Sequence, residues 1–152
     1  MIRTDKRIRI CTVLLVCNLI FIWGNSLLPG EISGAISDFV KDLVYKLLPG
    51  TSGAGEGGHG LLRKAAHFTE FACLGALLCW LTAMLGKPRA LAMAVAFLTA
   101  CADETIQRFV PDRGPAFKDV LIDTSGAITG MILLLVGYAF VIRKKQAMED
   151  KK

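Results

Sequence analysis

The sequence predicts an all-α integral membrane protein with four transmembrane helices, and three observations support this prediction. Hydrophobic residues make up 53% of the 152 residues, and the mean hydropathy of +0.51 is too high for an ordinary soluble domain. Four apolar segments are each long enough to cross a bilayer, which takes about 20 residues of helix. Basic residues gather at both ends of the chain and in one short turn. We expect one membrane domain over residues 1–152.

The predicted spans cover residues 8–28, 61–86, 90–110 and 119–142. The first and last are the most apolar, whereas the second and third carry polar residues at one end. The first also has the basic start of a signal peptide, but its apolar core is long and no small-residue cleavage site follows it cleanly. We therefore expect it to remain in the protein as a span.

Residues 32–48, between the first two spans, place apolar side chains on one helical face and charged side chains on the other. This pattern predicts an amphipathic helix. The helix would lie along the outer membrane surface or pack on the bundle as a lid, and the sequence favours neither arrangement. Residues 49–60 are rich in glycine and are expected to form a flexible loop.

The distribution of positive charge predicts the orientation of the chain. With four spans, both termini and the turn after the second span lie on the same side of the membrane. The positive-inside rule assigns that basic side to the cytoplasm, so the amphipathic helix is expected to be extracytoplasmic. The net charge of +5 then reflects topology, and no nucleic-acid partner is expected. The basic residues concerned are Arg3, Lys6, Arg7, Arg9, Lys87, Arg89, Arg143, Lys144, Lys145, Lys151 and Lys152.

The five cysteines all fall inside apolar segments. They show no Cys-x-x-Cys spacing and their number is odd, so neither a zinc knuckle nor a disulfide framework is predicted. The chain also lacks a P-loop and a Gly-x-Ser-x-Gly motif. We therefore expect no cofactor.

Charged and polar side chains gather at one end of the second and third spans. At 100° per residue, Arg63, His67 and Glu70 point within about 60° of one another, with Lys64 at the edge of that face. Charges at the edge of the hydrocarbon are costly, so a chain that keeps this many is expected to use them. The third span contributes Asp103, Glu104 and Gln107.

The fourth span presents Asp119, Asp123, Gly126 and Gly130 on one narrow face. Gly126-x-x-x-Gly130 is a small-residue surface that allows another helix to approach closely. Because the two aspartates continue this surface, we expect them to point into the bundle rather than into lipid. The predicted topology then places the polar ends of three spans at one level, near the extracytoplasmic surface.

These residue types suit two kinds of chemistry. A phosphate or carboxylate could be held by basic and amide groups, and the ligand-binding candidates are Arg63, Lys64, Gln107, Arg113 and Asp119. His67 could exchange a proton with a neighbouring carboxylate, and the candidates for general acid–base catalysis are His67, Glu70, Asp103, Glu104 and Asp123. His67 and the acids could also bind a divalent ion, but their spacing matches no established metal motif, so no metal ligand is predicted.

The same charges could instead serve only to hold the helices together. The local ion pairs that would do this are Arg113–Asp119, Lys64–Glu70 and Arg108–Glu104. Against this reading, the acids outnumber their local partners.

At these residues the chain resembles the VanZ-like family. Residues 63–71 are similar to the family's R-K-x-x-H-x-x-E-[FY] stretch, and residues 103–113 to its D-E-x-x-Q-x-F-x-P-x-R string, with Asp119 and Gly126 following. Residues 25–30 are similar to its Ser/Pro-Gly segment, and the resemblance covers residues 20–134. Asp123 departs from it, because many members have an asparagine there, and this leaves the role of Asp123 open.

The resemblance implies a multi-pass protein of the bacterial plasma membrane. The family is named for a protein associated with low-level resistance to teicoplanin, and it supplies no list of catalytic residues. We expect the protein to bind an anionic envelope component, either a lipid-linked cell-wall precursor or a phospholipid head group, through an outward-facing polar pocket. Whether it modifies that component is open. The alternatives are a proton- or ion-coupled transporter, which the nearly charge-free inner halves of the spans disfavour, and a non-catalytic scaffold.

Overall fold

The computed structural model describes residues 2–47, 58–114 and 116–149. The described chain is all-helical and contains no strand. Four of its helices are long and apolar enough to cross a membrane, which confirms the predicted class. The five helices are α1 (Ile2–Ser26), α2 (Gly30–Leu47), α3 (Gly58–Met84), α4 (Arg89–Gln107) and α5 (Phe117–Glu149).

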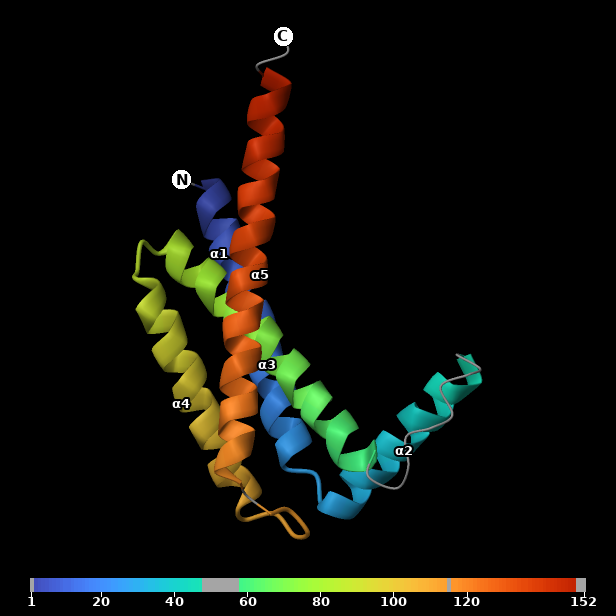
Figure 1. Cartoon of the computed structure of the whole chain (residues 1–152). Helices are drawn as coiled ribbons and strands as arrows, with labels where there is room; N and C mark the ends of the chain where they lie inside the picture. The colour runs from blue at the N-terminus through green and yellow to red at the C-terminus, as the bar shows by residue number, and fades with distance from the viewer. Residues whose placement is uncertain (1, 48–57, 115, 150–152) are drawn as a thin grey trace.

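The long helices α1, α3, α4 and α5 pack side by side as a bundle (Figure 1). The start of α1, the turn between α3 and α4, and the end of α5 lie toward one end of the bundle. The start of α3, the loop between α4 and α5, and helix α2 lie toward the other end. The segments that carry the basic residues used above to predict the orientation therefore lie toward one end, and the polar ends of three spans lie toward the opposite end.

Helices α3 and α5 approach each other through glycine. A Cβ atom added at Gly126 would fall on the carbonyl oxygen of Phe68, and one at Gly130 would fall on that of Ala72. On α3, a Cβ atom added at Gly75 would likewise fall on the backbone of Ala127 in α5. The small-residue surface predicted on the fourth span is therefore confirmed as a packing surface. Its close contact with α3 brings the acidic start of α5 next to the polar start of α3.

The apolar core lies between these helices and includes Ile22 of α1, Phe71 and Leu74 of α3, and Met131 of α5. On α4 the core face is made of alanines at four-residue spacing, namely Ala92, Ala96 and Ala100. The same face continues into the polar residues near the end of α4. Large apolar side chains on the outer surfaces of α1 and α5 are exposed, as expected for helices that meet lipid.

Helix α2 leaves the bundle at its polar end (Figure 1). The N–H of Gly30 donates to the carbonyl oxygen of Pro111 over 3.2 Å, and a Cβ at Gly30 would fall on the carbonyl oxygen of Asp112. The start of α2 is thus held against the loop between α4 and α5. Apolar side chains on the predicted face remain exposed, Ile36 at 49% and Phe39 at 71%. This face does not cover the bundle as a lid in the described structure.

The Gly-rich loop predicted at residues 49–60 falls mostly outside the described residues. Its last three residues, 58–60, form the first turn of α3 instead. The remaining helix ends lie within a few residues of the expected spans, apart from α1 and α5, which extend further into the polar ends of the chain.

Candidate functional site

The ten predicted site residues gather at the end of the bundle from which α2 departs. We call these ten residues the polar cluster. Seven of them are buried: His67, Glu70, Asp103, Glu104, Gln107, Arg113 and Asp123. The other three, Arg63, Lys64 and Asp119, are half-buried at its edge. The residues come from α3, α4, α5 and the loop before α5, so the fold brings together residues that lie far apart in the sequence.

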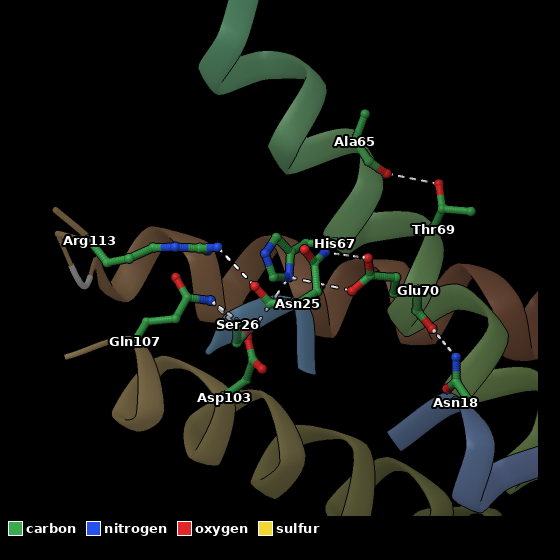
Figure 2. A network of polar contacts seen from close by, with 10 residues as sticks. All are labelled: Asn18, Asn25, Ser26, Ala65, His67, Thr69, Glu70, Asp103, Gln107 and Arg113. Carbon is green, nitrogen blue, oxygen red and sulfur yellow. Dashed lines mark hydrogen bonds and ion pairs between the residues drawn. The ribbon is translucent and has the colours of Figure 1, made fainter. Parts of the chain in front are cut away.

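His67 lies between carboxylates from two helices (Figure 2). Its Nδ1 atom is 3.8 Å from Oε2 of Glu70 on the same helix and 3.8 Å from Oδ2 of Asp103 on α4. These distances exceed hydrogen-bond reach, and neither ring nitrogen has a hydrogen-bond partner among the described residues. The imidazole is therefore buried beside two carboxylates and is hydrogen-bonded to neither of them.

Glu70 is oriented by α1. The Nδ2 atom of Asn25 donates to Glu70 Oε1 over 2.9 Å, while Asn18 donates to the backbone carbonyl of Glu70 over 3.4 Å. Neither asparagine was predicted as part of the site. The signal that could have found them is their seven-residue spacing, which places two amides on one face of an otherwise apolar span.

Asp103 is held by Gln107, one turn later on α4. Gln107 Nε2 donates to Asp103 Oδ2 over 2.9 Å and lies 3.2 Å from Ser26 Oγ on α1. The other carboxylate oxygen of Asp103, Oδ1, is buried and has no hydrogen-bond partner in the described part of the chain. One amide thus joins α4 to the end of α1 and fixes the carboxylate of Asp103.

Arg113 binds the end of α1. Its Nη2 donates to the carbonyl oxygen of Asn25 over 2.9 Å, and its Nε donates to that of Leu28 over 3.2 Å. The last carbonyls of a helix lack partners within the helix and carry partial negative charge, so a cation there is stabilising. Burial, together with the positive charge of Arg63, lowers the pKa of Arg113 from its ordinary value. Only Nη1 is left without a hydrogen-bond partner in the described structure.

The three local ion pairs considered above do not form among the described residues. Lys64 reaches across to α5 instead, with its Nζ 3.5 Å from Asp119 Oδ1. Glu104 accepts a hydrogen bond from the backbone N–H of Ala116, just before α5 begins. Arg113 donates to the carbonyl oxygens of Asn25, at the end of α1, and of Leu28, just after it. In each case the charged group has a partner that is distant in sequence.

A small cavity opens beside His67. Its volume is about 10 Å³, enough for about one water-sized group. Its basic lining groups, Arg63 and Lys64, come from α3, and its acidic ones, Asp119 and Asp123, come from α5. The lining residues are Arg63, Lys64, His67, Gln107, Asp119, Ile122 and Asp123.

Asp123 completes the cluster from α5. Its side chain is only 2% exposed, and among the described residues it forms no hydrogen bond or ion pair. One ligand atom from each of His67, Asp103 and Asp123 lies within 4.8 Å of the others. Three helices therefore deliver an imidazole and two carboxylates to one buried point.

Comparison with known proteins agrees with the resemblance seen in the sequence. The family model described as VanZ/LLP1 matches residues 11–140, a stretch that contains the whole polar cluster. No curated protein and no solved structure matches the chain significantly. Four apolar helices and this match make the chain a multi-pass membrane protein. It belongs to the VanZ/LLP1 family.

Proposed function

We propose that the protein binds an anionic group of the bacterial cell envelope at the polar cluster, and that this group belongs to a lipid-linked wall precursor or a phospholipid. The observation that carries the proposal is the small cavity in which Arg63 and Lys64 stand beside the buried His67. Guanidinium and ammonium groups are the usual partners of phosphates and carboxylates.

The proposed orientation places both termini in the cytoplasm of the plasma membrane and the polar cluster near the outer surface. Its support is the gathering of the basic segments at the opposite end of the bundle. In this orientation α2 lies on the outer surface with its exposed apolar face against the membrane. A lipid head group would then reach the cluster without leaving the membrane.

The size of the cavity limits what can enter. A volume of about 10 Å³ admits one oxygen of a phosphate or carboxylate rather than a whole head group. The rest of the head group would lie at the rim, where the half-buried Arg63 and Lys64 are available. Lys64 already pairs with Asp119, so Arg63, which forms no ion pair with the residues that the structure describes, would supply the positive charge for the ligand.

A proton-transfer step would rest on His67. Its imidazole lies 3.8 Å from Glu70 and from Asp103, and catalytic hydrogen bonds are often long until the substrate is bound. Modification of the bound component is therefore a further part of the proposal. An effect on teicoplanin sensitivity would follow if that component is a wall precursor.

The first test is lipid binding by the purified protein. The protein in a neutral detergent is titrated with phosphatidylglycerol and, separately, with zwitterionic phosphatidylcholine, and the melting temperature and bound lipid are measured. We expect the anionic lipid alone to stabilise it, and Arg63→Ala to weaken that effect. Lys145→Ala, at the opposite end of the bundle, is the control and should behave as wild type. Equal stabilisation by both lipids would contradict the proposal.

A scaffold role is the second candidate, and the interhelical bonds made by the polar cluster favour it. Asn25–Glu70 joins α1 to α3, and Arg113 joins the α4–α5 loop to α1. If these bonds are the only purpose of the cluster, Glu70→Gln and Asp103→Asn should lower stability and leave lipid binding intact. If the leading proposal holds, lipid binding falls in variants that remain folded.

A further inference from the structure

We propose that His67, Asp103 and Asp123 bind one divalent metal ion where α3, α4 and α5 meet. Such a site would exist whether or not a lipid binds at the cavity, so it goes beyond the function proposed above. The three residues are 36 and 20 positions apart along the chain, and only the packing of the three helices brings them together.

The first observation is the geometry of the donor atoms. One ligand atom from each residue lies within 4.8 Å of the other two. The ligands of a tetrahedral ion are about 3.4 Å apart when each metal–ligand bond is about 2.1 Å. Since no two of the donor atoms are more than 4.8 Å apart, they need to move inward by about 1 Å at most to reach this geometry.

The second observation is the unsatisfied state of the buried groups. His67 is 6% exposed and Asp103 is fully buried, yet both imidazole nitrogens and Asp103 Oδ1 have no hydrogen-bond partner in the described residues. Burying such atoms without a partner is unfavourable, because they lose their hydrogen bonds to water. A metal ion would bind one ring nitrogen and one oxygen from each carboxylate at a single point.

The third observation is the charge balance of the polar cluster. It contains five carboxylates (Glu70, Asp103, Glu104, Asp119, Asp123) and three cationic groups (Arg63, Lys64, Arg113), so with all of them ionised the formal charge is −2. One divalent cation would neutralise it. Two of these cations already have partners, because Lys64 pairs with Asp119 and Arg113 donates to the carbonyl oxygens of Asn25 and Leu28.

The neighbours of the three residues suit a metal site as well. If Nε2 holds the ion, Glu70 Oε2, which lies 3.8 Å from His67 Nδ1, would accept the Nδ1–H after moving closer by about 1 Å. Gln107 Nε2 orients Asp103 through its 2.9 Å hydrogen bond. Partners of this kind set the tautomer of a ligating histidine and the direction of a ligating carboxylate.

One imidazole and two carboxylates favour Zn²⁺ or Mn²⁺ over Ca²⁺, which prefers a larger set of oxygen ligands. Three protein ligands leave a fourth position open, as in sites where a metal meets water or a substrate. The small cavity is lined by both His67 and Asp123, so that open position would face it.

Metal binding by the full chain tests the proposal. The protein is purified with a tag free of histidine and stripped of metal with a chelator. It is then titrated with Mn²⁺, and the spin-resonance signal of the free ion reports how much is bound. A separate titration with Zn²⁺ is measured by calorimetry. We expect one ion per chain for at least one of these metals. Asp123→Asn and His67→Gln should each weaken binding by about tenfold or more.

The controls are His59→Gln, which removes the chain's other histidine, and Asp42→Asn at an exposed position of α2; both should bind as wild type. No stoichiometric binding of either ion by the folded wild type would overturn the proposal, as would unchanged affinity in both cluster variants. If the cluster variants do not fold, the visible spectrum of the Co²⁺-loaded wild type decides. Bands of a nitrogen- and oxygen-bound ion support the site, whereas thiolate charge-transfer bands assign the ion to cysteine and overturn it.

Discussion

Asn25 on α1 donates a 2.9 Å hydrogen bond to the carboxylate of Glu70 on α3, while its own carbonyl oxygen accepts from Arg113. One residue at the end of the first span therefore connects α3 with the loop before α5 (Figure 2). The polar cluster depends on this connection, because Glu70 is one of the two carboxylates that flank His67. The end of α1 is thus part of the site, although none of its residues was among the ten predicted site residues.

Removing the Asn25 amide should destabilise the bundle. Asn25→Ala leaves Glu70 Oε1 without its donor, and such a loss costs about 1–3 kcal/mol when the acceptor is buried. This loss of stability is measured as the difference in unfolding free energy between wild type and variant in mixed micelles. Asn18→Ala is the matched control, because Asn18 makes a longer bond of 3.4 Å to a backbone carbonyl, and we expect a smaller loss. Equal losses in the two variants would contradict the special role of the Asn25–Glu70 bond.

Gly130 should not tolerate a larger side chain. In Gly130→Ala the new methyl group would fall on the carbonyl oxygen of Ala72, so α3 and α5 would have to separate, at a cost of about 1–3 kcal/mol. Gly137→Ala is the control on the same helix, since nothing lies within 4 Å of that position. Thermal unfolding in detergent compares the two. A neutral Gly130→Ala would show that the helices do not pack this closely in the membrane.

Arg113 should not be replaceable by lysine. The guanidinium donates to two carbonyl oxygens through two different nitrogens, and the ammonium group of lysine cannot reproduce this fork. We expect Arg113→Lys to cost about 1–3 kcal/mol of unfolding free energy although the charge is kept. Arg108→Lys, at an exposed position, should be neutral. If Arg113→Lys has the wild-type stability, charge alone accounts for the contact.

His67 should be needed for function more than for folding. It makes no hydrogen bond with the described residues, so His67→Ala is expected to keep most of the folded yield in detergent. If expression of the wild type protects a host against teicoplanin, as proposed above, the same variant should lose that protection. Glu70→Gln, Asp103→Asn and Arg113→Ala are scored alongside for yield and protection. A collapse of yield in all four variants would mean that the charges only hold the bundle together.

Much of the architecture was predictable because it depends on local patterns. Hydropathy alone identified the four spans, since the bilayer selects for helices of a given length and polarity. The repeat Gly126-x-x-x-Gly130 predicted the packing surface of α5 for a similar reason, because only small residues allow two backbones to approach. The ten polar residues were predicted from their positions at the ends of apolar helices, and the fold brings them together.

The pairing within the cluster was not predictable in the same way. The sequence suggested ion pairs between near neighbours, yet Lys64 meets Asp119 on α5 and Arg113 meets the carbonyls of α1. Helical periodicity indicates which residues share a face of one helix. It does not indicate how far that helix is rotated or shifted relative to the next helix.

The amino-acid sequence was therefore sufficient for the membrane class, the spans and the set of polar residues, because these follow from burial of apolar surface and from the repeat of a single helix. Only the tertiary structure decided which polar groups face one another. The close contact of α3 with α5 at Gly126 and Gly130 places Asp123 beside His67, and the packing of α4 adds Asp103. That convergence depends on the relative rotation and register of three helices, and no local pattern in the chain encodes it.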